Sequence, residues 1–314
     1  MLTRKKFIKA VRDTFSLSLL TILSPSLFTK ILKADTPSKS GFDLLALRGG
    51  SSPADLFKTG IAQMGGMHRF VKKGGTVLVK PNIGWDRSPE YGANTNPDLV
   101  EAVIKDCYKA GAAKVYIFDH TCDQWQNCYK KSGIQNAAAK TGAELVPASS
   151  KEYYIQTSLP NGRVLKEVLV HKLFVQCDTV INIPVLKHHS STGLTASMKN
   201  LMGVVWDRGE WHRRDLHQCI ADFSTFRKPD LVIIDGWRVM TRNGPRGYGV
   251  SDTENMKYLF LSTDPVAADS ASAMVLAKTS GLKSPADIRY IKLAGEMGLG
   301  KNDLSKITIK RITV

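Results

Sequence analysis

The chain has 314 residues, enough to bury a substantial core as one large domain or as two lobes that share a sheet. Hydrophobic residues make up 43% of it and charged residues 23%, which excludes an intrinsically disordered protein. The formal net charge of +16 favours anionic partners. We do not expect nucleic acid among them, because the sequence has no zinc-finger spacing, basic zipper or base-stacking motif.

Residues 1–34 resemble an export signal. A basic start at residues 3–9 precedes a modestly apolar stretch at residues 15–28, and a small residue stands at Ala34. The start is similar to the twin-arginine signal of bacteria, with Lys5 where the second arginine usually stands. The apolar stretch is too short and too polar to span a bilayer stably. We therefore expect the export machinery to carry the protein to the periplasm. An amphipathic helix or an uncleaved membrane anchor is the alternative.

Five cysteines limit the metal and redox chemistry. None forms a C-x-x-C pair, so the sequence predicts neither an iron–sulfur cluster nor a structural zinc site. Cys122 and Cys128 are close enough in sequence to form a disulfide, which an exported protein would permit. The sequence leaves that bridge open.

Strand and helix patterns alternate from about residue 42 onward. They predict a single α/β domain, residues 42–314, with a mostly parallel sheet and helices on both faces. Weaker apolar runs around Asn161 and Gly162 predict a small β insertion at about residues 143–172. Strands are expected at residues 43–48, 76–83, 114–120, 179–186, 229–236, 257–262 and 307–314, the last at an edge. Helices are expected at residues 53–70, 97–111, 194–204, 216–226 and 286–297, and from residue 265 onward.

Ionisable residues follow five of the predicted strands. Ligands of parallel α/β sheets sit at the carboxyl ends of the strands, so these residues are expected to converge if the strands are parallel. The groups are Lys80 with Asn82, Asp119 with His120, Lys187 with His188 and His189, Asp235, and Asp264 with Asp269.

The strand that ends at Lys187 predicts an anion site. We expect a helix to begin directly after Gly193, near Thr195, with free N–H groups that bind carboxylate or phosphate. Lys199, four residues after Thr195, would share its helical face, although a surface lysine is the alternative. The predicted anion-binding residues are Lys80, Asn82, Lys187, Thr195, Lys199 and Asn200.

Proton transfer is assigned to His189 or His120, with Lys187 beside them, because imidazole titrates near neutral pH. His188 and His189 are adjacent on a strand and point to opposite faces, so we expect only one of them to enter the site.

Three carboxylates form a weaker hypothesis. Asp235, Asp264 and Asp269 would orient the catalytic groups or hold a divalent metal, although no local spacing indicates a metal site. Asp264 stands before Pro265 and would equally cap a helix, and Asp235 stands before a glycine and would equally serve a turn. The cofactor is therefore unknown from the sequence.

An ordered series of motifs resembles the bacterial and archaeal family called domain of unknown function 362. The resemblance covers nearly everything after about residue 42 and supports the α/β architecture. Members of that family are often exported or fused to ferredoxin-like modules, whose cysteines this chain lacks. The family has no generally established reaction. The motifs are VLVKPNI (77–83), NTNPDLVEAVI (94–104), DTVINIPVLKHH (178–189), LTASMKNLMG (194–203), LVIIDG (231–236), NGP (243–245), STDPVAADSASA (262–273) and GLG (298–300).

A fainter likeness links the chain to the lactate racemase family. Its amino-terminal lobe carries an Asp-His-Thr motif after a strand, which Asp119, His120 and Thr121 are similar to. Lys187 and His189 stand where that family holds its nickel-pincer cofactor, but Cys122 departs from the pattern. We do not expect the cofactor on this basis.

Together these features predict an exported α/β enzyme or enzyme-like protein that binds a small anionic substrate or cofactor at the strand carboxyl ends. Two alternatives remain: a non-catalytic periplasmic binding or assembly protein, and a distant isomerase similar to lactate racemase.

Overall fold

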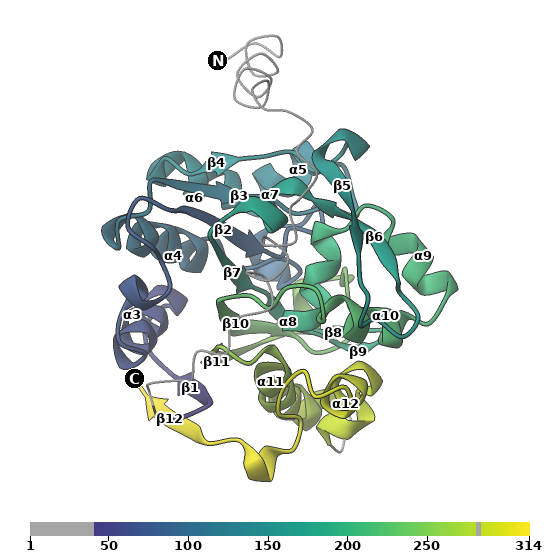
Figure 1. Ribbon diagram of the computed structural model, residues 1–314. Helices are drawn as coiled ribbons and strands as arrows, with labels where there is room; N and C mark the ends of the chain where they lie inside the picture. Colours follow the sequence, from purple (N-terminus) through teal and green to yellow (C-terminus); the bar gives the residue numbers. More distant parts are fainter. Residues whose placement is uncertain (1–40, 281–283) are drawn as a thin grey trace. The chain divides into compact units, whose positions relative to one another are not determined.

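The computed structural model describes residues 41–280 and 284–314, which belong to one compact unit (Figure 1). The predicted export signal at residues 1–34 lies outside the described residues. Among the helices that are described, none combines the length and the apolar character needed to cross a membrane.

A ten-stranded sheet runs through the described residues in the order β12-β1-β11-β10-β7-β2-β3-β4, with β8 beside β10 and β9 beside β8. Most pairs are parallel, as predicted, and β12 lies at an edge. The strands are β1 (Leu44–Arg48), β2 (Thr76–Pro81), β3 (Lys114–Ile117), β4 (Glu144–Leu145), β7 (Thr179–Ile183), β8 (Val185–His189), β9 (Gly193–Thr195), β10 (Leu231–Met240), β11 (Thr253–Ser262) and β12 (Ile309–Thr313).

Strand β11 reverses the direction of the sheet. It pairs antiparallel with both β10 and β1. The carboxyl end of β11 therefore lies beside the amino end of β10, away from the carboxyl ends of β2, β7 and β10. The expectation that Asp264 joins the other strand ends is wrong for this reason.

Helices cover both faces of the sheet, as the α/β pattern predicts (Figure 1). Alternating strand residues feed two separate cores: Val77 and Val79 pack with α3 and α4 on one face, while Leu78 packs in the core of the other face. The helices are α3 (Pro53–Gln63), α4 (Pro97–Lys109), α5 (Trp125–Lys131), α6 (Ile134–Thr141), α7 (Lys172–Gln176), α8 (Ser197–Asn200), α9 (Arg208–Arg213), α10 (Leu216–Phe223), α11 (Pro265–Ser280) and α12 (Arg289–Glu296).

The weakly patterned region around residues 143–172 contains a separate antiparallel hairpin, β5 (Tyr154–Ser158) with β6 (Glu167–His171). Its buried residues Tyr154, Val168 and Val170 join the core that also contains α10 and α11 residues. The insertion is thus packed onto one face of the sheet, while β4 extends the main sheet by pairing with β3.

The predicted helix at residues 194–204 is shorter than expected. Gly193 has a φ of +71°, which lets the chain reverse and form β9 against β8. Thr195 is therefore the cross-strand partner of Lys187, and α8 begins only at Ser197. The inference that Thr195 and Lys199 share a helical face is wrong. The two residues still lie beside the same cavity.

Candidate functional site

A cavity of about 290 Å³ lies between the β8–β9 hairpin, α8, α9 and the loops that follow β2 and β3. Its volume corresponds to roughly ten water molecules at about 30 Å³ each, which suits a small ligand. Six residues that the sequence assigned to binding or catalysis line it: Asn82, Lys187, His189, Thr195, Lys199 and Asn200.

Lys187 lies in the wall of this cavity and is 1% exposed. Its Nζ donates hydrogen bonds to Asn82 Oδ1 at 3.0 Å and to the Ala93 carbonyl. Burial is the main reason why the pKa of Lys187 is lowered to about 7, and it outweighs the opposing effect of Cys122. Lys187 therefore exists in both protonation states near neutral pH.

Lys80 forms a buried ion pair behind the cavity. Its Nζ lies 2.9 Å from Asp119 Oδ1 and donates to Asn200 Oδ1 and to the Pro81 carbonyl. Burial lowers the pKa of Lys80, and the Asp119 carboxylate opposes that effect. Gly203 makes the close packing possible, because a Cβ atom there would stand 1.8 Å from Asp119 Oδ1.

The side chains of Asn200 and Asn82 connect Lys80 to Lys187 through hydrogen bonds. Lys80 has only donors, so Asn200 turns its Oδ1 to it and donates from Nδ2 to Asn182 Oδ1 at 2.8 Å. Asn82 then donates to the same Asn200 oxygen at 2.9 Å. This leaves Asn82 Oδ1 as the acceptor for Lys187. The network fixes the amide orientations and positions both amines.

Lys199 and Arg208 supply the remaining positive charge. The side-chain amine of half-buried Lys199 makes no hydrogen bond or ion pair with any of the described residues, and burial lowers its pKa to about 8. Arg208 donates to the carbonyls of His120 and Thr121 and to the sulfur of Cys122. Since Asp119 is paired with Lys80, the cavity has a surplus of cations.

The histidines take different positions. His189 lines the cavity, and its Nδ1 accepts the Ser191 N–H, so the remaining proton is on Nε2. Burial lowers the pKa of His189 to about 2, which makes it a hydrogen-bond donor and a poor proton acceptor. His188 instead accepts the Gly244 N–H. His120 is not among the lining residues; it stacks on Trp206 and contacts the Val205 carbonyl.

Asp269 occupies the helix start that we had predicted to be free for a ligand. Its two oxygens accept the N–H groups of Ser197 and Met198, the first residues of α8. Asp269 is fully buried, and burial raises its pKa to about 7. The chain thus provides its own carboxylate at this position, and α11 fixes the short helix that carries Lys199 and Asn200.

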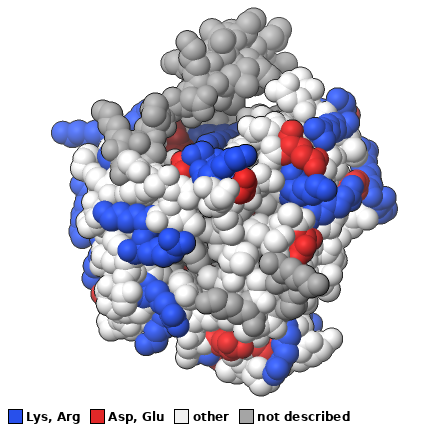
Figure 2. Space-filling model, turned by 90° about the horizontal axis from the view of Figure 1, so that it is seen from below, with Lys and Arg blue, Asp and Glu red and all other residues white. Residues whose placement is uncertain are grey.

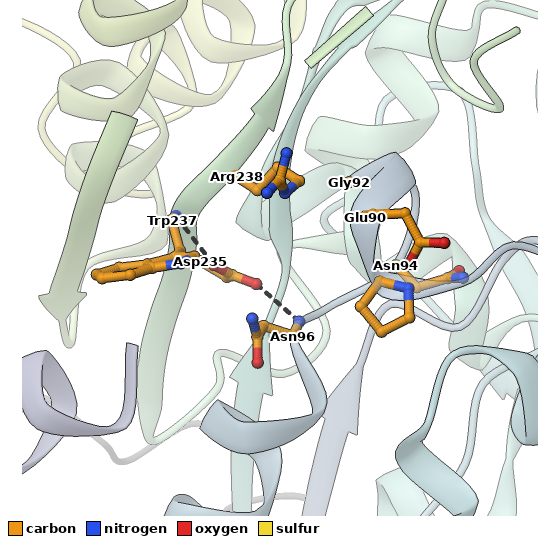
Figure 3. Close-up of a pocket in the computed structure, with 8 residues that line it drawn as sticks. Glu90, Gly92, Asn94, Asn96, Asp235, Trp237 and Arg238 are labelled. Carbon is orange, nitrogen blue, oxygen red and sulfur yellow. Dashed lines mark hydrogen bonds between the residues drawn. The ribbon is translucent and has the colours of Figure 1, made fainter. Parts of the chain in front are cut away.

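Asp235 faces a different pocket, of about 280 Å³ (Figure 3). Its oxygens accept the N–H groups of Asn96 and Trp237, which ties the start of α4 to β10. Figure 3 shows Asp235 and Trp237 on one side of this pocket, with Glu90 and Asn94 across from them. Burial raises the pKa of Asp235 to about 6.

The three carboxylates of the metal hypothesis lie in three places. Asp264 caps α11 through the N–H groups of Val266 and Ala267, while Asp235 and Asp269 have the backbone partners described above. In the part of the chain that is described, no group of three or more His, Cys, Asp or Glu side chains is arranged to hold a metal ion. The structure therefore does not assemble the proposed metal site.

Sequence reasoning missed Arg208 and Cys122 as residues of the cavity. Arg208 is the first residue of the short helix α9, and Cys122 lies in the loop after β3. No local spacing marks either residue, and only the fold brings them beside Lys187 and Lys199. Cys122 is exposed and Cys128 is buried, and both are free thiols.

The outer surface is basic in scattered groups. Figure 2 shows Lys and Arg side chains in several separate patches on one face, with Asp and Glu among them. This face has no continuous basic stripe, so the positive charge inside the cavity is the more specific signal for an anion.

A protein-family model described as Domain of unknown function (DUF362) matches residues 77–274, more than half of the chain. The chain belongs to this family. The matched DUF362 region contains every residue that lines the cavity, from Asn82 to Pro245.

Two further proteins are similar to this DUF362 protein. The thylakoid-associated protein sll1697 of Synechocystis sp. is 28% identical over 221 residues, which cover 68% of this chain and 66% of that protein. The lactate racemase apoprotein of Thermoanaerobacterium thermosaccharolyticum matches with a TM-score of 0.45 and 15% identity, over 78% of this chain and 60% of that chain. The chain thus spans about two thirds or less of each. At this level the structural likeness says nothing of function.

Proposed function

We propose that this DUF362 protein is an enzyme that binds a small organic anion in the cavity and moves a proton to or from it through Lys187. The observation that carries the proposal is Lys199, a half-buried ammonium group in the cavity wall without a partner among the described residues. A buried charge without a partner is costly, and a carboxylate or phosphate would supply that partner.

Lys187 supports the proton-transfer part of the proposal. With a pKa of about 7, both its acid and its base form are available at neutral pH, as general acid–base catalysis requires. His189 would donate a hydrogen bond from Nε2 to the ligand and would not accept the proton.

Calorimetry with acetate, lactate, pyruvate and inorganic phosphate tests the binding step. The Lys199→Gln variant should bind the preferred anion at least roughly tenfold more weakly, which corresponds to about 1.4 kcal/mol. Lys306→Gln is the charge-matched control, because the Lys306 side chain is 77% exposed and its ion pair is with Asp303, outside the cavity. The proposal fails if none of these anions binds, or if both variants bind like the parent.

Proton exchange separates an enzyme from a binding protein. In D₂O, NMR should show the parent replacing a carbon-bound proton of an anion that binds. Lys187→Arg keeps the positive charge but does not titrate near neutral pH, so it should bind the anion and lose the exchange. Binding without exchange in the parent would favour the alternative of a non-catalytic binding protein.

We also propose that residues 1–34 direct export to the periplasm, in keeping with their basic start and apolar stretch. Fractionation of a bacterial host with mass spectrometry of the intact protein tests this. A cytoplasmic protein that retains residues 1–34 would contradict it.

A further inference from the structure

The three lysines around the cavity differ in how many hydrogen-bond acceptors each one has. Lys80 donates to Asn200 and the Pro81 carbonyl, and the Asp119 carboxylate forms an ion pair with it as a third neighbour. Lys199 has no such acceptor among the described residues. Lys187 has two, Asn82 Oδ1 and the Ala93 carbonyl.

Two acceptors match a neutral amine, which has two N–H donors and one lone pair. With both donors of Lys187 held by the protein, the lone pair occupies the remaining tetrahedral position. Lys187 lines the cavity, so that position is the one left for a molecule inside it. The Asn82 oxygen cannot exchange with its amide nitrogen, because that nitrogen donates to Asn200. The orientation of the amine is therefore fixed.

Burial also favours the neutral form of Lys187, because it lowers the pKa of this amine more than any facing group changes it. Among the facing groups, Cys122 and Asp119 raise the pKa of Lys187, and Lys199 and Lys80 lower it. An amine that is desolvated and placed beside other cations is the arrangement that activates lysine as a nucleophile.

From this geometry we infer that Lys187 forms an imine with the carbonyl group of a small 2-oxo acid bound in the cavity. The inference rests on the proposed function and names its substrate class. The carboxylate of the 2-oxo acid faces Arg208 and Lys199, and its carbonyl carbon faces Lys187 Nζ.

The reaction balances without an oxidant or a metal. The Lys187 nitrogen forms a bond to the carbonyl carbon, and the oxygen takes up a proton from the amine to give a carbinolamine. The carbon–oxygen bond then breaks, and the oxygen leaves as water with one further proton. Amine, carbonyl and one proton thus give a protonated imine and water. Lys199, an ammonium group with a pKa of about 8, can supply that proton and recover it from solvent. His189 Nε2–H hydrogen-bonds the departing oxygen.

Reductive trapping tests the inference. The full-length protein is incubated at neutral pH with pyruvate and cyanoborohydride, then analysed by intact mass and peptide mapping. The expected result is one reduced pyruvate adduct per chain on Lys187, absent when lactate, which has no ketone group, replaces pyruvate. Lys187→Arg should lose the adduct, and Lys306→Gln should retain it.

Calorimetry on the same samples separates failure of imine formation from failure of anion binding. If pyruvate binds but no adduct forms on Lys187, or if the adduct lies on exposed lysines and persists in Lys187→Arg, the imine inference is overturned and anion binding stands. If neither pyruvate nor any other anion binds, the proposed function fails as well. Because the parent protein alone gives a decisive result, folding of the variant does not limit the test.

Discussion

Replacing Gly203 with alanine should destabilise the protein through one buried ion pair. A Cβ atom at this position would lie 1.8 Å from Asp119 Oδ1 and 2.7 Å from Lys80 Nζ, well inside van der Waals contact. Gly203 has no left-handed backbone angle, so the effect would come from space alone. The other Asp119 oxygen is held by the Ile83 N–H at 2.6 Å, which limits how far the carboxylate can turn.

The magnitude follows from what must move. Overpacking a core by one methyl group costs about 1–3 kcal/mol. Separating a buried carboxylate from the cation that pairs with it costs about 3–5 kcal/mol. We therefore expect the free energy of unfolding to fall by about 3 kcal/mol, a large share of the 5–15 kcal/mol typical of folded domains. At about 2–4 °C per kcal/mol, the Tm should fall by roughly 6–12 °C.

Urea denaturation and thermal melts of Gly203→Ala measure this effect. Gly209→Ala is the matched control, because the nearest atom to its Cβ would be 3.8 Å away. The control should stay within about 0.5 kcal/mol of the parent. Combining Gly203→Ala with Asp119→Ala should cost less than the sum of the single changes, since the clash is removed. A Gly203→Ala protein as stable as the control would refute the reasoning.

Three further predictions concern titratable groups. Anion binding should weaken between about pH 6 and about pH 9, because Lys187 and Lys199, with pKa values of about 7 and about 8, lose their protons in this range. Calorimetry at several pH values would show the loss of affinity, and an affinity independent of pH would contradict the prediction. Asp269→Asn has one oxygen for two backbone donors, so it should lose about 1–3 kcal/mol of stability and bind anions more weakly; unchanged stability and affinity would exclude this positioning role. Because the pKa of Asp235 is raised to about 6, its protonated form stabilises the protein below about pH 4, and this stabilisation is lost by about pH 7. The loss is about 3 kcal/mol, at 1.36 kcal/mol per pH unit. Urea denaturation of Asp235→Asn should therefore show a free energy of unfolding that falls by about 3 kcal/mol less over this pH range than in the parent, and an equal fall would refute the prediction.

The strand ends could be read from the sequence because buried parallel strands form continuous apolar runs with a sharp end. Lys80 and Lys187 each stand at the end of such a run, and the sheet places both at the carboxyl ends of its parallel strands. The pattern of apolar residues does not, however, indicate whether a strand runs parallel or antiparallel to its neighbours. Strand β11 has an apolar run like theirs but is antiparallel to β10, and for this reason the predicted position of Asp264 is wrong.

Long-range partners could not be predicted from local pattern. The segment after Gly193 reads as a helix start, but a reversal at that glycine and the pairing of Thr195 with Lys187 replace the first helical turn by a strand. Asp269, 72 residues beyond Ser197, then satisfies the helix start. Arg208 likewise reaches the cavity through the fold alone. Such contacts depend on which faces meet, which spacing within one element does not encode.

The arrangement of the cavity couples protonation to ligand binding. In the free protein, burial lowers the pKa of Lys187 and of Lys199, and neighbouring cations add to this effect, so part of the positive charge is lost near neutral pH. A bound anion reverses this effect because it favours the charged form of each lysine. Binding should therefore take up protons, and calorimetry in buffers of different ionisation enthalpy would show it. Imine formation with Lys187 would add a dependence of opposite sign to the reaction rate, since the reacting amine must be neutral. For a 2-oxo acid, the rate of imine formation should thus pass through a maximum near the pKa of Lys187, whereas the affinity for lactate should only fall as the pH rises.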